Sequence, residues 1–384
     1  MVYYTIKLPP EYHQMTLEEL LFSSESLDLT KFNNNNRNIT TTRTYSMYDL
    51  SLNIKRRVRV WELINELKTF NKNTEPLKSI PRKSLYREFS IPKKSGGFRK
   101  IDAPNDELKE ALRGLKKIFE EKFGALYHTS AYAYISGRST IDAVKKHQSN
   151  KSKWFGKYDL SNFFGSTTLE YTMKMLGMIF PFSEVIKADF WNGKQVLEEA
   201  LELAFLDGVL PQGTPISPLI TNLIMIPVDY RLANTLRDWE GQAYTYTRYA
   251  DDFLVSSKYT FDVKKVEKLI VDTLAGFDAP FTINASKTRY GSSSGRNWNL
   301  GVMLNKDNEI TVGHKKKKQF QAALHSFIMD TQNNNRWELG SVQELNGLYS
   351  YYRMVEKDTI DAIIEHVNKK HGVNVIEMIK EQLR

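Results

Sequence analysis

The chain has 384 residues, with 54 Lys or Arg against 45 Asp or Glu, so its formal net charge is +9. It contains no cysteine, which excludes disulfides, thiol nucleophiles and cysteine-ligated metal centres and favours a reducing cytoplasm. Because 41% of its residues are hydrophobic, it can bury the cores of roughly two or three domains. The positive surplus favours a polyanionic partner, although ordinary solubilising charge would give the same total.

The first residues do not read as a targeting segment. Lys7, Glu11 and Glu18 interrupt the apolar residues before Phe22, whereas a signal peptide has a basic region followed by an apolar one. No stretch approaches the roughly 18 apolar residues of a membrane span. We therefore expect a soluble protein without a membrane partner.

Residues 1–80 differ in composition from the rest, with an Asn run at 33–36 and a Thr run at 40–42. We interpret them as an N-terminal extension. Within it, the basic cluster Lys55–Arg59 precedes an amphipathic helix through Trp61 and Leu67. That cluster is typical of a nucleic-acid contact and equally of a solvated helix face.

Two β-rich runs flank the basic segment Lys93–Arg99 and predict a pair of strands joined by a Gly-containing loop. Asp106 then fits the cap of a helix whose apolar residues recur at helical spacing through Phe119. A strand is expected from Trp154 to Asp159, and a turn-rich segment, Pro211–Pro218, leads into an apolar helix.

Farther along, the runs Tyr244–Tyr249 and Phe253–Ser257 predict a hairpin with acidic residues at its tip. A helix from Val263 to Gly276 and a strand at Phe281–Ile283 follow, and the chain after Gly301 is mostly helical. Strand, helix, hairpin, helix and strand is the order of a ferredoxin-like sheet in an α+β fold.

This order brings Asp159 beside Asp251 and Asp252. Three adjoining carboxylates repel one another, so they are stable mainly when divalent cations neutralise them. Oxygen ligands suit Mg²⁺, with Mn²⁺ as a substitute, and two such ions can activate an attacking hydroxyl and stabilise a leaving phosphate oxygen. Taken alone, Asp251-Asp252 is more typical of a simple hairpin turn.

The segment Tyr249-Ala250-Asp251-Asp252 resembles the palm signature of reverse transcriptases. Neighbouring segments resemble further blocks of bacterial members of this family, in the same order along the chain: Ile91–Ile101, Ser136–Thr140, Lys157–Phe164, Pro211–Pro218, Ala285–Thr288 and Leu300–Gly301. The resemblance implies an RNA-directed DNA polymerase with a right-hand architecture. It implies fingers at 81–158 with part of 165–210, a palm at 159–304 and an α-helical thumb at 305–384.

The resemblance also implies site roles. Asp159, Asp251, Asp252 and the Leu160 carbonyl would hold the metals, and Lys287 would act as general acid toward pyrophosphate or as a compensating charge. The incoming dNTP would contact Lys93, Arg99, Phe164, Gln212 and Gly213, with Phe164 as the gate against a 2′-hydroxyl. The nucleic acid would contact Arg138, Leu300, Gly301, Lys315, Lys316 and Lys317, although the lysine run also fits a charged helix face.

Departures from family patterns bear on the subtype. The chain is too short for the added domains of group II intron proteins, Gln212-Gly213 is unlike diversity-generating enzymes, and Asn299-Leu300-Gly301 differs from the usual retron block. We therefore expect a free-standing bacterial enzyme that copies a non-coding RNA encoded nearby, in antiviral defence. A retron enzyme that makes RNA-linked DNA is one alternative, and a non-catalytic RNA-binding scaffold is another.

Overall fold

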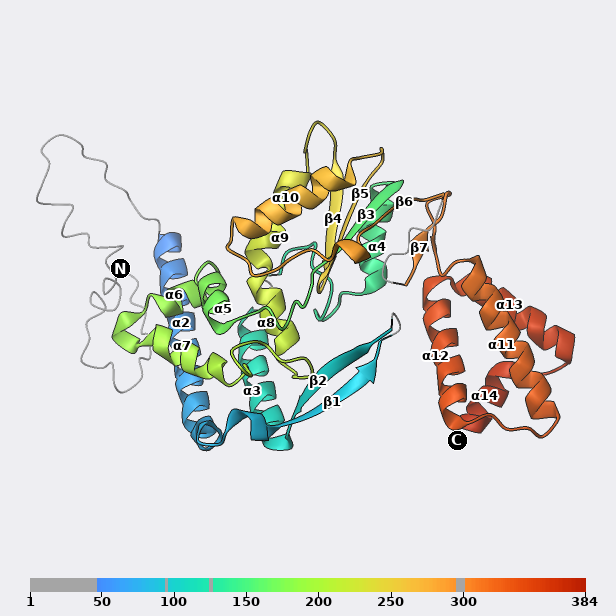
Figure 1. Cartoon of the computed structure of the whole chain (residues 1–384), viewed down its shortest axis with the longest axis horizontal. Coiled ribbons are helices and arrows are strands. Elements are labelled where there is room, and N and C mark those ends of the chain that lie inside the picture. The colour runs from blue at the N-terminus through green and yellow to red at the C-terminus, as the bar shows by residue number, and fades with distance from the viewer. Residues whose placement is uncertain (1–46, 94–95, 124–126, 295–300) are drawn as a thin grey trace, which may run out of the picture. The chain divides into compact units, whose positions relative to one another are not determined.

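The computed structural model describes residues 47–93, 96–123, 127–294 and 301–384, with only the backbone given at 47–58 and 121–123 (Figure 1). The chain forms two compact units. One takes in the chain up to Phe123 together with Leu176–Leu206, and the other takes in Gly124–Met175 and Asp207–Arg384. None of the described helices is both long and apolar enough to cross a membrane.

A long helix organises the first unit. Helix α2 (Met47–Lys78) packs against α3 (Asp106–Phe123), α6 (Phe182–Ile186) and α7 (Gly193–Glu202), which follows the short η4 (Asp189–Trp191). Leu63, Ile64 and Leu67 are buried on its inner face, as the sequence predicts. The side-chain amide of Asn71 donates a 2.9 Å hydrogen bond to the Val196 carbonyl. Helix α2 is therefore part of the core of this unit.

The predicted strand pair of the first unit is confirmed. After η3 (Arg82–Leu85), strands β1 (Tyr86–Pro92) and β2 (Phe98–Pro104) pair antiparallel from Tyr86↔Pro104 to Pro92↔Phe98. The predicted cap of α3 is wrong by one residue. Asp106 is the first helical residue, and the side-chain oxygen of Asn105 accepts the Leu108 amide at 2.9 Å, because an N-cap oxygen accepts from the N–H two or three residues later.

The second unit is built on a four-stranded antiparallel sheet. Its strands are β3 (Trp154–Asp159), β4 (Tyr244–Tyr249), β5 (Asp252–Ser257) and β6 (Arg289–Ser292), in the order β4-β5-β3-β6. Helices α8 (Ser217–Ile224) and α9 (Ile226–Leu236) precede β4, and α10 (Val263–Ala275) links β5 to β6. This is the predicted ferredoxin-like connection. Helix α5 (Leu169–Leu176) follows β3 and ends at the unit boundary.

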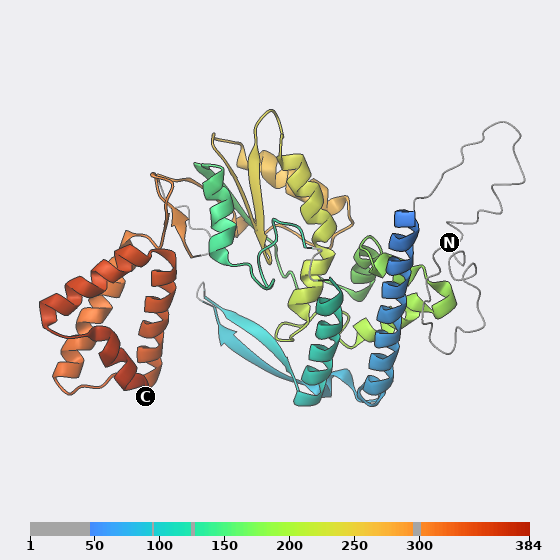
Figure 2. The same ribbon diagram turned by 180° about the vertical axis from the view of Figure 1, so that it is seen from behind.

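Different helices cover the two faces of this sheet (Figures 1 and 2). On one face, the Tyr158 hydroxyl donates to the Val263 carbonyl at the start of α10. On the other face lies α4 (Thr140–Ser149), whose His147 hydrogen-bonds to the hydroxyls of Thr247 and Ser256. Because side chains alternate along a strand, Asp159 and Asp252 belong to the α4 face.

The predicted strand at Phe281–Ile283 is wrong. This segment makes only an isolated bridge between Leu160 and Ile283, and the fourth strand is β6. Pro280 cannot donate to a ladder, and the Phe281 ring packs edge-on against Phe163, with centroids 4.9 Å apart. The short helix η5 (Ala285–Lys287) separates the segment from β6.

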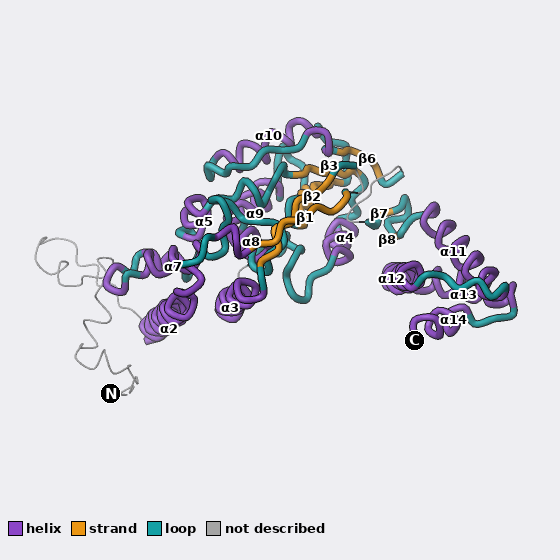
Figure 3. Tube along the Cα trace, turned by 60° about the horizontal axis from the view of Figure 1, so that its bottom comes forward, coloured by secondary structure: helices purple, strands orange, loops and turns teal. Residues whose placement is uncertain are grey.

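The end of the chain is helical, as the sequence predicts. After strands β7 (Met303–Leu304) and β8 (Ile310–Thr311) come α11 (His314–Gln332), α12 (Leu339–Val355), α13 (Lys357–His371) and α14 (Val375–Leu383). Figure 3 shows these helices gathered side by side. Phe320, Leu324 and Phe327 of α11 share a buried core with Phe155 and Leu254 of the sheet.

Candidate active site

Two central strands bring the predicted acids together. Asp159 ends β3 and Asp252 begins β5, and the two residues are partners in the antiparallel register. The pairing Tyr249↔Asp252 leaves Ala250 and Asp251 as the turn of the hairpin. The Leu160 amide donates to the Asp251 carbonyl at 3.0 Å, which ties the turn to the end of β3.

A lysine lies against each of two aspartates. The Lys287 ammonium donates to Asp159 Oδ1 at 2.8 Å, and the Lys157 ammonium lies 2.9 Å from Asp252 Oδ2. Asp252 Oδ1 is buried and has no hydrogen-bond partner. Burial raises the pKa of the Asp251 carboxyl, and it raises the pKa of Asp252 to about 6 against the opposing effect of Lys157. Burial at this site therefore disfavours the ionised form of both carboxyls.

These carboxylates fit hard divalent cations. In the described residues no group of three His, Cys, Asp or Glu side chains is arranged as a metal centre, and lysines hold one oxygen each of Asp159 and Asp252. The orphaned Oδ1 of Asp252 is a buried acceptor that lacks a donor, and a buried polar group of that kind is costly unless something satisfies it. A cation bound there would supply the missing partner and neutralise the repulsion.

Other residues that are predicted to contact the nucleotide lie in the same unit. Phe164 is half-buried after the end of β3, with its ring centroid 5.9 Å from that of Phe163. Gln212 and Gly213 lie in the loop before α8, where Gly213 has φ +121°. The hydroxyl of Ser217 fixes this loop by donating to the Pro211 carbonyl at 2.9 Å. The left-handed backbone at Gly213 favours glycine.

Lys93 and Arg99 belong to the first unit. The Lys93 amide donates to the Gly97 carbonyl at 2.9 Å, and the Gly96 amide donates to the Lys93 carbonyl at 3.0 Å, which closes the β1–β2 loop. Both basic residues are exposed. Their predicted contact with the triphosphate stays a prediction.

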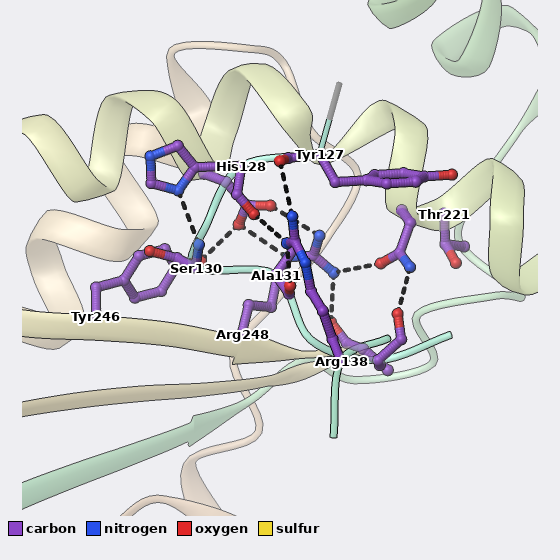
Figure 4. Close-up of polar contacts among 12 residues, drawn as sticks. Tyr127, His128, Ser130, Ala131, Arg138, Thr221, Tyr246 and Arg248 are labelled. Carbon is purple, nitrogen blue, oxygen red and sulfur yellow. Dashed lines mark hydrogen bonds and ion pairs between the residues drawn. The ribbon is translucent and has the colours of Figure 1, made fainter. Parts of the chain in front are cut away.

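Arg138 has a structural task that sequence reasoning did not foresee. Its guanidinium donates to the carbonyls of His128 and Ala131 at 2.6 Å each, and to the Tyr127 carbonyl at 3.3 Å (Figure 4). These bonds hold the loop before α4 in shape. These bonds do not bear on its predicted contact with nucleic acid, which stays a prediction.

The predicted nucleic-acid contacts at the end of the palm and the start of the thumb fall in different environments. Leu300 lies outside the described residues, whereas Gly301 is described and has φ +91°. Lys315 is exposed at the start of α11. The Lys317 ammonium, in contrast, lies 2.8 Å from Glu356 Oε1, with only 21% of its side chain exposed. Lys317 therefore stabilises the thumb.

Sequence reasoning missed Arg248 and Asp229. The Arg248 side chain is completely buried, and its Nε and one terminal nitrogen each lie 2.8 Å from an Asp229 carboxylate oxygen (Figure 4). Its other terminal nitrogen donates to Asn222 Oδ1 at 3.1 Å and to the Ala250 carbonyl at 3.0 Å. An arginine directly before a Tyr-Ala-Asp-Asp turn was a visible signal, but its partners in α8 and α9 were not.

Comparison with known proteins decides the family. The model of the family described as reverse transcriptase (RNA-dependent DNA polymerase) matches residues 91–323. The chain belongs to the reverse transcriptase family. That range contains every acid and lysine of the candidate site described above, including Asp159, Asp251, Asp252 and Lys287.

Similar curated reverse transcriptases come from retrons. The Ec83 enzyme of Escherichia coli is 28% identical over 79% of this chain and 92% of its own. The Ec73 enzyme of the same species is 29% identical over 65% of this chain and 79% of its own. The Mx65 enzyme of Myxococcus xanthus is 26% identical over 72% of this chain and 63% of its own. All three are retron enzymes, the class that sequence reasoning placed second for this chain.

Among solved structures, this reverse transcriptase is similar to telomerases. Apo telomerase from Candida tropicalis is 12% identical, with a TM-score of 0.46, over 78% of this chain and 62% of that one. Telomerase from Candida albicans in complex with a fragment of telomeric RNA is 12% identical, with a TM-score of 0.42, over 77% of this chain and 59% of that one. The chain thus spans less than two thirds of either telomerase.

Proposed function

We propose that this reverse transcriptase adds deoxynucleotides to a primer 3′-hydroxyl on its own cognate non-coding RNA, as a retron-type enzyme making RNA-linked DNA. The retron relatives support this choice of RNA partner. The observation that carries the catalytic part is the pairing of Asp159 with Asp252, whose Oδ1 is orphaned, beside Asp251, whose carboxyl feels the charge of Asp159. A role in antiviral defence stays a prediction from the resemblance.

The acids define the metal ligands of this proposal. Asp159, Asp251 and Asp252 would hold the ions through carboxylate oxygens, with the Leu160 carbonyl as a further ligand. When bound, two Mg²⁺ ions would lower the pKa of the primer hydroxyl and stabilise charge on the leaving pyrophosphate, and Mn²⁺ would serve in their place. Lys287, 2.8 Å from Asp159 Oδ1, would protonate pyrophosphate or balance the charge of the acids.

The non-catalytic scaffold is the competing class. A scaffold has no use for buried carboxylates whose pKa values burial raises, because each ionised group then costs folding free energy. The site thus favours an enzyme over a scaffold, and only a measurement of incorporation separates the two.

Primer extension tests the catalytic part. Purified protein receives a primed RNA template, Mg²⁺ and dNTPs, beside the Asp251→Asn, Asp252→Asn double variant. Asp272→Asn is the matched control, since that acid lies on the exposed face of α10 and pairs with Lys268. We expect incorporation by the wild type and the control only. Equal incorporation by the double variant, or none by the wild type on any template including co-purified RNA, would contradict the proposal.

Sequencing of nucleic acid bound to the protein in cells tests the retron part. DNA joined covalently to an internal guanosine of an RNA is the expected product. DNA attached to the protein would instead show protein priming, and unlinked DNA would favour the other free-standing enzymes.

A further inference from the structure

The buried Arg248–Asp229 pair touches the aspartate turn at one point. Besides its two bonds to Asp229, Arg248 donates to the carbonyl of Ala250, the residue directly before Asp251. Ala250 has φ +56°, a left-handed conformation that residues other than glycine seldom adopt. Such a residue persists only where its surroundings hold it, and the Arg248 guanidinium is the group that holds its carbonyl.

Arg248 lies on the opposite face of the sheet from the acids. It reaches Asp229 of α9, whereas Asp252 and Asp159 share the face of α4. The guanidinium is fully buried, so it contacts neither nucleotide nor cation directly. Any effect on catalysis passes through the backbone from Ala250 to Asp251.

The backbone of Arg248 is fixed as well. Its amide donates to the Ser130 carbonyl at 2.7 Å, and its carbonyl accepts the Tyr132 amide at 2.9 Å. Arg138 holds the carbonyl of Ala131, which lies between them (Figure 4). The loop before α4 thus runs beside β4 and leaves Arg248 little freedom on either side.

These contacts require an arginine rather than a lysine. A planar guanidinium presents several donors in a fixed fork, so it can bind both oxygens of Asp229 and still reach the Ala250 carbonyl. A lysine ammonium carries the same charge on a point and cannot span these acceptors. A buried ion pair contributes little net stability, because desolvation offsets its attraction. A role in fixing the geometry of the turn therefore explains this pair better than a role in stability.

We infer that Arg248 is a positioning residue for polymerisation: it fixes the Ala250 carbonyl and thereby aims Asp251 and Asp252. The inference rests on the proposed function. Asp229 anchors the guanidinium, and Asn222 orients it by accepting from the same nitrogen that reaches Ala250.

The test compares Arg248→Lys with Tyr246→Phe in the full chain. Tyr246 donates its hydroxyl to Asp229 Oδ1 at 2.8 Å and lies in the same buried network without touching Ala250. Hydrogen–deuterium exchange without metal or nucleic acid reports on the turn. We expect Arg248→Lys to speed exchange about tenfold or more at residues 250–252 and at the Leu160 amide, which donates to Asp251. Tyr246→Phe leaves both unchanged.

Primer extension supplies the second readout. We expect Arg248→Lys to lower kcat about 100-fold, the cost of misplacing reacting groups by about 1 Å, with KM for dNTP within about twofold. Tyr246→Phe keeps its kcat within about threefold at temperatures well below its Tm. Circular dichroism confirms that both variants are folded, and if Arg248→Lys is not, Asn222→Ala replaces it with the same expectations.

The outcomes separate the inference from the proposed function. Exchange at the turn that is equal in Arg248→Lys and the wild type overturns the inference, whatever the activity. Wild-type activity with an unchanged kcat in Arg248→Lys also overturns it. Absence of wild-type activity overturns the proposed function instead, and the exchange measurement still decides whether Arg248 fixes the turn.

Discussion

Lys316 donates a hydrogen bond of 2.7 Å from its ammonium group to the carbonyl oxygen of Gly301. The first turn of α11 is thereby joined to Gly301, two residues before the start of β7. Gly301 has φ +91°, and a methyl group added to its Cα would lie 3.3 Å from the Tyr351 hydroxyl of α12. This glycine is therefore held between two helices of the thumb.

We predict that Gly301→Ala weakens primer extension and destabilises the protein by about 1 kcal/mol, because alanine is strained at positive φ. Gly372→Ala is the matched control: that residue has φ +64° at the end of α13, with open space around its Cα. Both variants should lose similar stability in urea unfolding, and only Gly301→Ala should raise KM for the primed template. Equal KM values would count against a primer contact at Gly301.

We predict that two nearby lysines differ in role: Lys315 affects template binding and Lys317 affects stability. Exposed Lys315→Ala should reduce the salt dependence of template binding by about one phosphate contact, with unchanged stability. Lys317→Ala should cost about 2 kcal/mol, because Glu356 loses its ion pair while it still accepts the Val312 amide. Fluorescence anisotropy at several salt concentrations and urea unfolding measure the two effects. An unchanged salt slope for Lys315→Ala would favour a simple charged helix face.

We predict that Phe164→Val raises incorporation of ribonucleotides about tenfold or more, since a smaller side chain leaves room for a 2′-hydroxyl. Competition between rNTP and dNTP in primer extension measures the ratio of kcat/KM values. Phe163→Leu is the control, because Phe163 is buried against Phe281 and its loss should reduce stability alone. Sugar selectivity that is the same in all three proteins would remove Phe164 as the gate.

We predict that acid destabilises the protein through His147. Burial, with a smaller effect of Lys146, lowers the pKa of His147 from its ordinary 6.5 to about 3. Below pH 6.5 the unfolded chain therefore binds a proton that the folded chain refuses, so stability falls as the pH falls from 6.5 toward 3. At pH 5 the loss is about 2 kcal/mol.

The variant His147→Gln keeps a donor and an acceptor for Thr247 and Ser256 but does not titrate. Its free energy of unfolding should therefore change about 2 kcal/mol less than that of the wild type between pH 7 and pH 5. Urea unfolding at the two values measures this difference. Equal pH dependence in both proteins would show that other groups govern the acid response.

The periodic parts of this fold could be predicted from sequence. The β4–β5 hairpin and the helices of the thumb follow from alternating or helical apolar patterns, and these elements appear where expected. The segment at Phe281 misled because its β-forming residues pack as a loop, and β6, with Tyr290 in a short and partly exposed strand, has no such pattern. Local pattern does not reveal which segment pairs with β3.

The candidate site, too, could be predicted from the sequence only in part. The acids stood out because adjacent carboxylates in a turn are chemically costly, and the strand order placed Asp159 beside them. Arg248 looked like an ordinary charged residue, since its ion-pair partner Asp229 lies on a helix whose packing no local pattern specifies. The same holds for Lys317, whose partner Glu356 is distant in sequence.

Asp159 and Asp252 sit on the two strands of the sheet that have neighbours on both sides, β3 and β5. Because side chains alternate, one residue inserted into either strand would turn its aspartate toward the opposite helical layer, and ladders on both sides would resist the slip. Length changes are therefore tolerated only between the strands. A residue inserted in such a connection leaves Asp159 and Asp252 paired across the ladder and on the same face of the sheet.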